Sequence, residues 1–288
     1  SSDVCSSDLV LEGGAMRGIY TAGVLDVFME QGLHFDGVIG VSAGALHGCS
    51  FVSGQKGRSI RYFKKYRNDR HFMSMWNLVH TGEIVGEKLC YHDIPERLDP
   101  YDYEAFLESD TEFYATCSNV ETGKAEYIKV TDMMNQIDVL RASASMPYVS
   151  KIVEYQGMKL LDGGCTDSIP VEQFRKMGYE RNVVILTQHR DYIKKPQNPR
   201  VAELRYHKYP EFARALKERH LVYNQSLKEI HRLEEAGEVF VIQPSEKLNI
   251  SRMETDLDVI QSVYEQGMME ARVRMKALKE WLAEGKEE

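Results

Sequence analysis

Short apolar runs alternate with glycine-containing turns and helical patterns over the first part of the chain. The apolar run 9–11 enters the glycine-rich stretch 13–18, and apolar residues then recur at helical spacing until Gly32. The run "FDGVIGV", residues 35–41, predicts a second buried strand, and "SAGALHGCSFV", residues 42–52, predicts a buried helix. This order is typical of a parallel sheet that helices cover on both faces.

The remainder of the chain continues the alternation of strands and helices. Residues 111–118 and 125–130 alternate as strands do around the turn "ETGK", and a hairpin is predicted over "IVEYQGMKLLDGG". "VVILTQ" predicts a fully buried strand, and two charged amphipathic helices, 211–236 and 254–282, flank the strand "EVFVIQP". We expect an α/β fold, a three-layer sandwich with a mostly parallel central sheet.

We expect one domain over residues 9–288, with a C-terminal helical extension at about 211–288. A chain of 288 residues is long enough for a single large domain with a well-buried core. Residues 1–8 are polar and serine-rich and carry no turn chemistry, which indicates a non-native or disordered leader.

Composition narrows the class of protein. A net charge of -8 argues against nucleic-acid binding, which needs a basic face. No apolar run approaches the roughly 18 to 20 residues that span a bilayer, and the N-terminus lacks the order of a secretory signal. The five cysteines are widely spread and form no CxxC pair, so we expect neither a disulfide framework nor a zinc site. This use of cysteine fits a reducing compartment, and we expect a cytoplasmic location.

The segment 56–70 is locally basic, with aromatic residues between its lysines and arginines. It could touch an anionic membrane, so peripheral and transient membrane contact stays open, but a solvated helix face is favoured because acidic residues dominate the chain. The following segment, 71–98, is rich in aromatic residues and methionine and is irregular in period. We expect it to form a lid or an acyl pocket.

Ser42 is a candidate nucleophile, because "GVSAG" follows a predicted strand. A serine hydrolase must expose the hydroxyl at a tight turn, beside a base and beside donors for the oxyanion. Gly40 and Gly44 remove Cβ atoms where strand and helix crowd together, and the following helix directs its positive end toward the reacting centre. A plain tight turn is the alternative, and this motif alone is weak.

The glycine loop 13–18 strengthens the nucleophile hypothesis. Adjacent parallel strands would bring its free N–H groups beside Ser42 as an oxyanion hole or anion nest. A dinucleotide loop is the alternative, but "GGAMRG" does not have the GxGxxG spacing and no acidic residue ends a second strand at the expected distance. A phosphate-binding GK[ST] motif is also absent.

Two kinds of base are considered for Ser42. His189 follows a convincing strand and is the histidine for a Ser-His-Asp triad, although a loop histidine is the more ordinary interpretation. We expect His47 in the core, and we expect solvated helix positions for three others, namely His207, His220 and His231. No HExxH or comparable pair indicates a metal.

Asp162 is the stronger candidate for the base. It ends an apolar strand, and two glycines follow it, so another backbone can come close. A carboxylate with an ordinary pKa near 4 is a poor base. It becomes competent when it is partly desolvated and held directly against the serine hydroxyl.

Four separated blocks together resemble the patatin-like phospholipase family, lipid acyl hydrolases that use a Ser/Asp dyad. The blocks are "EGGAMRG", "GVSAG", "ASASMPYV" and "LLDGG", in that order, and the resemblance covers roughly residues 9 to 190. It implies that Ser42 is the nucleophile and Asp162 the base.

The resemblance further implies that Gly13, Gly14 and Ala15 form the oxyanion loop. It implies that Arg17 lies near an anionic head group or fixes the loop, and an ordinary salt bridge is the alternative. It also implies a structural role for Pro147. The family often carries three glycines in its first block, whereas Glu12 precedes two here. This departure leaves open which N–H groups face the oxyanion.

These features predict a serine acyl hydrolase that cleaves carboxylic esters of lipids without a cofactor or metal. The expected partner is a lipid or acyl-ester substrate, and no oligomeric state is assigned. Two alternatives stay open, a non-catalytic lipid-binding or regulatory protein on the same fold and a Ser-His-Asp esterase.

Overall fold

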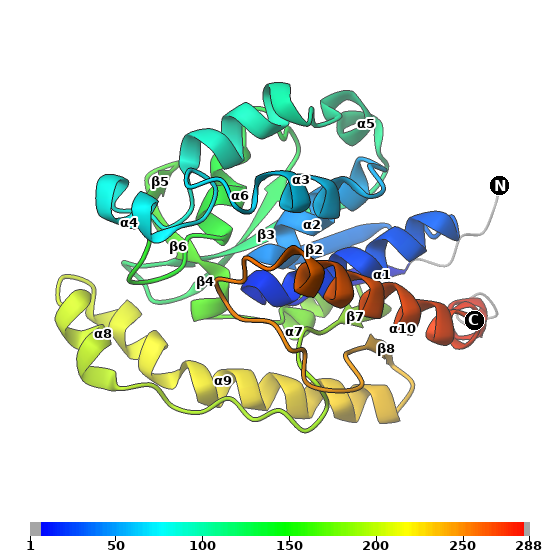
Figure 1. The fold of residues 1–288 in the computed structure, drawn as a ribbon. Coiled ribbons are helices and arrows are strands. Elements are labelled where there is room, and N and C mark those ends of the chain that lie inside the picture. The colour runs from blue at the N-terminus through cyan, green and yellow to red at the C-terminus, as the bar shows by residue number, and fades with distance from the viewer. Residues whose placement is uncertain (1–6, 285–288) are drawn as a thin grey trace.

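A mixed eight-stranded sheet lies at the centre of the molecule in the computed structural model, which describes residues 7–284 (Figure 1). The strand order is β5-β6-β3-β2-β1-β7-β8, and β4 also pairs with β3. Strands β3, β2, β1, β7 and β8 run parallel, while β4 and β6 are antiparallel to β3, and β5 is antiparallel to β6. The bounds are β1 Asp8–Leu11, β2 Gly37–Val41, β3 Glu112–Asn119, β4 Ala125–Val130, β5 Val153–Tyr155, β6 Met158–Asp162, β7 Asn182–Ile185 and β8 Val239–Ile242.

Helices cover both faces of this sheet. Helices α1, α2 and α10 pack on one face, and α7 and α9 pack on the other (Figure 1). The expected three-layer α/β sandwich with a mostly parallel sheet is therefore confirmed. The α-helices are α1 Gly18–Glu30, α2 Ala43–Val52, α3 Arg58–Tyr66, α4 Met75–Thr81, α5 Tyr103–Glu108, α6 Ile137–Ser143, α7 Val171–Lys176, α8 Pro199–Arg205, α9 Pro210–Glu235 and α10 Leu257–Glu284. Shorter or wider turns are the 3-10 helices η1 Ala15–Arg17 and η3 Gly163–Cys165 and the π-helix η2 Lys88–Leu98.

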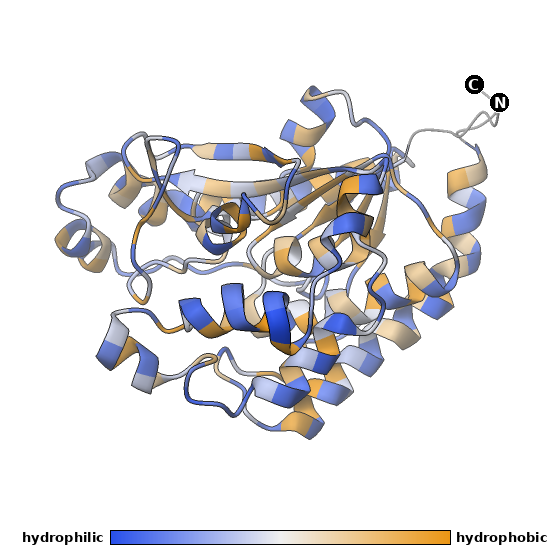
Figure 2. Ribbon diagram, turned by 90° about the horizontal axis from the view of Figure 1, so that it is seen from above, coloured by the Kyte–Doolittle hydropathy of each residue, from blue (hydrophilic) through white to orange (hydrophobic). Residues whose placement is uncertain are grey.

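The period-2 alternation along the parallel strands explains why both faces are covered. In β1, Leu9 and Leu11 join the core beneath α1, and Val10 joins the core beneath α9. Strand β7 repeats this pattern with Val183 and Val184 on opposite faces. All these side chains are fully buried, and Figure 2 shows the apolar colouring gathered on the central strands. A strand that is apolar on both faces needs a helical layer on each side.

Helices α1 and α10 cross at two glycines that let the backbones touch. A Cβ atom on Gly23 would overlap the carbonyl oxygen of Tyr264, and one on Gly267 would overlap that of Tyr20. The Tyr264 hydroxyl also donates a hydrogen bond of 2.5 Å to Asp26. This crossing joins the last helix to the helix that follows the glycine loop.

The N-terminal strand begins earlier than the sequence suggests. Residues 1–6 of the expected leader lie outside the described residues. Asp8 is fully buried and is the first residue of β1, where it pairs with Gly37 and Asn182. The strand predicted over residues 9–11 thus begins one residue earlier, because Asp8 pairs with strands on both sides.

The expectation of a solvated face over residues 56–70 is wrong for two arginines. Arg58 is 6% exposed and Arg67 is 1% exposed. Arg67 donates a hydrogen bond of 2.9 Å to the Met73 carbonyl, and the Arg58 guanidinium lies over the Tyr101 ring at 5.2 Å. Carbonyl and aromatic partners allow both long side chains to be buried.

Candidate active site

Ser42 lies at the tip of a tight turn between β2 and α2. Its backbone has φ 55° and ψ -121°, a conformation that non-glycine residues rarely adopt. A Cβ atom on Gly40 would lie 2.5 Å from the Ala45 Cα, and one on Gly44 would lie 2.5 Å from the Leu11 carbonyl oxygen. Both glycines are therefore required by close backbone approach, and together they hold the strained serine.

Strand β3 brings Ser42 and Asp162 together. Val41, just before the serine, pairs with Thr116, and Asp162 pairs with the next residue of β3, Cys117. The Ser42 hydroxyl donates a hydrogen bond of 2.6 Å to the Oδ2 atom of Asp162. Two candidates from distant parts of the sequence thus meet directly.

The Asp162 carboxylate is held in place by several backbone contacts. Its Oδ1 atom accepts a hydrogen bond of 2.8 Å from the Gly164 N–H, and its own N–H donates one of 2.9 Å to the Ser145 carbonyl. Burial raises the pKa of Asp162, against the opposing effects of the Ser42 hydrogen bond and the positive charge of Arg219. A buried carboxylate of this kind accepts a proton more readily than an exposed one.

Ser143 supports the turn at Ser42, and the sequence analysis missed it. The Ser42 N–H donates a hydrogen bond of 2.9 Å to the Ser143 hydroxyl, which itself donates one of 2.7 Å to the Thr116 carbonyl. One hydroxyl thus bridges the nucleophile turn and β3. The block "ASASMPYV" contains Ser143 and was the available signal.

The glycine loop lies beside the nucleophile. A Cβ atom on Gly13 would lie 3.2 Å from the Cβ of Ser42. The Gly13 N–H donates a long hydrogen bond of 3.4 Å to the Ser168 carbonyl, whereas those of Gly14 and Ala15 have no hydrogen-bond partner within residues 7–284. Ala15 has a positive φ of 47°. Two N–H groups of this loop are therefore free to bind an anion.

Glu12 anchors the loop where the family often has a third glycine. It is 1% exposed, and its carboxylate accepts hydrogen bonds of 2.5 Å from the Thr187 N–H and 2.6 Å from the Tyr223 hydroxyl. Arg17, at the other end of the loop, is half-buried, and its Nε has no hydrogen-bond partner. In the part of the chain that the structure describes, Arg17 forms no ion pair, so the salt-bridge alternative is not found there.

An apolar cavity of about 140 Å³ opens beside Ser42. Ala15, Leu46 and Met146 line it near the turn, and the segment expected to form a lid or acyl pocket supplies much of its wall. The wall residues from that segment are Phe72, Met73, Val85, Cys90, Tyr91, Ile94 and Pro95. Apolar and aromatic side chains form most of its wall, as is usual for sites that bind small apolar groups.

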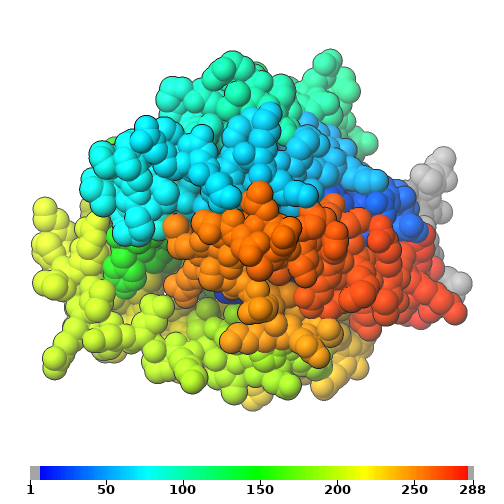
Figure 3. Space-filling view, in the orientation of Figure 1, coloured from blue at the N-terminus to red at the C-terminus, as the bar shows by residue number. Residues whose placement is uncertain are grey.

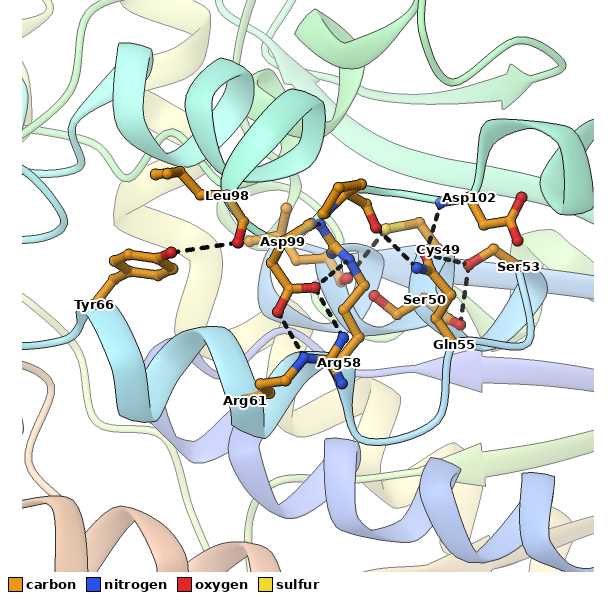
Figure 4. A network of polar contacts seen from close by, with 12 residues as sticks. Cys49, Ser50, Ser53, Gln55, Arg58, Arg61, Tyr66, Leu98, Asp99 and Asp102 are labelled. Atoms are coloured by element: carbon orange, nitrogen blue, oxygen red, sulfur yellow. Dashed lines mark hydrogen bonds and ion pairs between the residues drawn. The ribbon is translucent and has the colours of Figure 1, made fainter.

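Figure 4 shows a network of polar contacts that includes Cys49 and Arg58, two residues that also line the cavity. Cys49 lies about two turns along α2 from the nucleophile, and its carbonyl accepts a hydrogen bond of 2.7 Å from the Tyr101 hydroxyl. Arg58, which lines the cavity, donates one of 3.0 Å to the Asp99 carbonyl.

The rings of His47 and His189 contact residues other than Ser42 and Asp162. Within residues 7–284, no histidine is hydrogen-bonded to Ser42 or Asp162, and the His189 ring faces Tyr192 at 6.2 Å. His47 is a core residue, 2% exposed, and burial lowers its pKa to about 4. His207 is exposed as expected, whereas two others are half-buried, namely His220 and His231.

Neither a metal site nor a membrane-spanning helix is found within residues 7–284. No group of three or more His, Cys, Asp or Glu side chains there is arranged to hold a metal ion. None of the helices described there combines the length and the apolar character needed to cross a bilayer.

Several similar proteins each match about 60% of the chain. The uncharacterized protein YjjU of Escherichia coli is 32% identical over 185 residues, which are 62% of this chain and 51% of that protein. Lysophospholipase NTE1 of Cryptococcus neoformans is 25% identical over 62% of this chain, and that of Saccharomyces cerevisiae is 26% identical over 59%. The chain thus matches about half the length of YjjU and 11% and 10% of the two lysophospholipases.

A solved structure, that of VipD from Legionella pneumophila, superimposes with a TM-score of 0.43 and 13% identity, over 94% of this chain and 67% of VipD. Residues 209–283 match the model of a domain of unknown function, DUF6363. Residues 9–175 match the model of the patatin-like phospholipases, which covers more than half of the 288 residues. The chain therefore belongs to the patatin-like phospholipase family.

Proposed function

We propose that this protein is a serine acyl hydrolase that cleaves carboxylic esters of lipids through the pair Ser42 and Asp162. The observation that carries the proposal is the hydrogen bond of 2.6 Å between the serine hydroxyl and the buried carboxylate. Family membership and the lysophospholipase relatives support a lipid ester as the substrate.

The acylation step follows from this geometry. The Ser42 oxygen attacks the ester carbonyl carbon while its proton passes to Asp162. The carbonyl oxygen becomes negatively charged and accepts hydrogen bonds from the N–H groups of Gly14 and Ala15, which have no other partner among the described residues. The intermediate collapses as Asp162 returns the proton to the leaving alcohol, and the acyl group remains on Ser42.

Deacylation repeats these roles with water. A water molecule attacks the acyl carbonyl, and Asp162 accepts the proton that it loses. The bond to the Ser42 oxygen then breaks, Asp162 returns the proton to that oxygen, and the carboxylic acid leaves. The raised pKa of Asp162 suits this double role, because the carboxyl must both accept and return a proton.

The cavity beside Ser42 would hold the acyl chain, and Arg17 would face the head group of the substrate. Since the guanidinium forms no ion pair within residues 7–284, its charge is available to an anion. We place the enzyme in the cytoplasm with transient contact to membranes, where lipid esters lie.

Hydrolysis of p-nitrophenyl esters from acetate to palmitate tests the proposal. Wild type should turn over, and Ser42→Ala and Asp162→Asn should each lose several orders of magnitude in kcat, because both belong to one catalytic unit. An active Ser42→Ala variant would contradict the assignment of the nucleophile. A wild type that binds lipid but hydrolyses none of a panel of lipid esters would support the non-catalytic alternative.

A further inference from the structure

Three half-buried basic side chains approach the dyad without a carboxylate partner. Arg17 belongs to the glycine loop, Lys194 follows β7, and Arg219 lies on α9. No ion pair joins any of them to a carboxylate in the described part of the chain, and the Nε atoms of both arginines are buried without a hydrogen-bond partner. None of the three lines the apolar cavity.

Arg219 reaches the edge of the dyad. A Cβ atom on Gly164 would lie 3.2 Å from the Nη2 atom of Arg219 and 3.0 Å from the Oδ1 atom of Asp162. The arginine therefore lies across one glycine from the catalytic carboxylate without bonding to it. Its positive charge lowers the pKa of Asp162 against the larger effect of burial.

Lys194 is positioned by α9. Its N–H donates a hydrogen bond of 2.8 Å to the Asn224 side-chain oxygen, and its carbonyl accepts one of 3.0 Å from the Asn224 amide. The ammonium lies 4.1 Å from the centre of the Tyr223 ring. Because Tyr223 also bonds to Glu12, the same helix positions both the lysine and the glycine loop. An aromatic ring orients a cation but leaves its charge in place.

The charges that act on the pKa of Lys194 indicate that the three cations lie close together. Burial, and then the charge of Arg219, lower the pKa of Lys194 to about 8. The charged and aromatic groups around the ammonium are Arg219 and Tyr223 of α9, Glu12 and Arg17 of the glycine loop, Tyr192, and Arg252. Two carboxylates oppose these positive charges, and both already accept two hydrogen bonds: Glu12 from Thr187 and Tyr223, and Asp162 from Ser42 and Gly164. Excess positive charge in a partly buried site attracts an anion.

We propose that Arg17, Lys194 and Arg219 bind the phosphate of the substrate's head group, so that the preferred substrate is a phosphate-bearing acyl ester such as a lysophospholipid. Guanidinium and ammonium groups are the side chains that bind phosphate most strongly. The inference rests on the proposed function, because it places the phosphate beside the ester that Ser42 attacks while the acyl chain enters the apolar cavity.

The proposal gives the C-terminal part of the chain a role in the site. Arg219, Tyr223 and Asn224 belong to α9, within the matched segment 209–283. Figure 3 shows a recess in which dark-blue atoms from the start of the chain lie beneath the orange segment that precedes α10.

Paired substrates test the subsite through activity. The variants Lys194→Gln and Arg219→Gln are assayed on lysophosphatidic acid and on a monoacylglycerol with the same acyl chain. The ratio of kcat/KM for the phosphorylated over the neutral lipid should fall about tenfold or more in each variant, as expected for a lost charge-assisted contact. The matched control is Arg214→Gln, an arginine of α9 that is paired with Glu211. An unchanged ratio in both variants would overturn the proposal.

Binding to Ser42→Ala separates this proposal from the proposed function. Calorimetric titration with lysophosphatidic acid should give an affinity that falls about tenfold when Arg219→Gln or Lys194→Gln is added. If the wild type lacks hydrolase activity and this binding difference persists, the subsite stands and the proposed function alone fails. If the second substitution changes nothing, the subsite assignment fails whatever the activity.

Inorganic phosphate distinguishes a head-group subsite from a site for free phosphate. With a head-group subsite, phosphate should compete with lysophosphatidic acid and raise its apparent KM, without changing kcat for p-nitrophenyl butyrate. A phosphate-dependent change in kcat for this neutral ester, lost in Arg219→Gln, would indicate a regulatory anion site and overturn the head-group assignment.

Discussion

The Ser42 hydroxyl donates directly to the Asp162 carboxylate at 2.6 Å, although 120 positions separate the two residues in the chain. Such contact allows one proton transfer without an intervening imidazole. The contact depends on β3, since the neighbours Thr116 and Cys117 pair with the ends of β2 and β6. The chemistry of the site therefore rests on sheet register.

The acid limb of the pH profile should report Asp162. This carboxylate acts as a base only when it is deprotonated, and burial raises its pKa above the ordinary 3.8. Activity should therefore be full above that raised pKa and fall as the pH drops through it. The measurement is kcat/KM for p-nitrophenyl butyrate against pH. In Arg219→Gln the acid limb of the profile should move to higher pH, because a positive charge that lowers the pKa of Asp162 is lost. Movement of the acid limb to lower pH would contradict the assignment of this limb to Asp162.

Ser143→Ala should reduce activity through the backbone of the nucleophile turn. The substitution leaves the buried Ser42 N–H and the Thr116 carbonyl without their shared partner, at a cost of about 1–3 kcal/mol. We expect kcat to fall roughly tenfold, with a lower melting temperature. Ser226→Ala is the control, because that hydroxyl bonds only to a carbonyl of its own exposed helix turn. Equal kcat values for the two variants would argue against a positioning role for Ser143.

The acyl-chain optimum should be short. The cavity of about 140 Å³ is close to the roughly 150 Å³ of a dry apolar cavity that binds benzene, which suggests a chain of about six carbons. Tyr103→Ala removes an aromatic ring from the cavity wall next to Tyr101 and so enlarges the cavity. The substitution should shift the optimum to longer p-nitrophenyl esters. Leu107→Ala, 60% exposed on the same helix, is the control. A palmitate optimum in the wild type would show that this cavity does not limit the chain.

Gly267→Ala should destabilise the fold at the crossing of α1 and α10. The added Cβ would overlap the Tyr20 carbonyl oxygen, so the helices must separate, at a cost of about 1–3 kcal/mol. Urea denaturation measures this loss in the free energy of unfolding. Val273→Ala, 76% exposed on the same helix, is the control and should stay within about 0.5 kcal/mol. If Gly267→Ala unfolded at the same urea concentration as the wild type, the two helices would not touch at this position.

Local patterns predicted the parts of the fold that depend on local chemistry. Continuous apolar runs in 9–11 and 183–188 identified strands that are buried on both faces, and the glycines around Ser42 predicted a crowded turn. The contact between Ser42 and Asp162 was expected from the four motif blocks, and the structure has it.

Features that depend on long-range packing could not be predicted in this way. Glu12 stands where the family often has a glycine, and it accepts a hydrogen bond from Tyr223, which is 211 positions away in the sequence. Arg58 was expected on a solvated helix face because acidic residues dominate the chain, yet it is 6% exposed and its guanidinium lies over the ring of Tyr101, which is distant in the sequence. Ser143 lies in a motif block, but its role depends on partners in the turn after β2 and on β3, which are distant in the sequence.

Fluorophosphonate labelling with peptide mapping tests the central claim most directly, since it follows the attack of one serine and needs no natural substrate. The account predicts a label on Ser42 in wild type, an equal labelling rate in His189→Ala, and a rate reduced by orders of magnitude in Asp162→Asn. Wild-type labelling of Asp162→Asn, or loss of labelling in His189→Ala with the fold retained, would contradict a dyad in which Asp162 acts directly as the base.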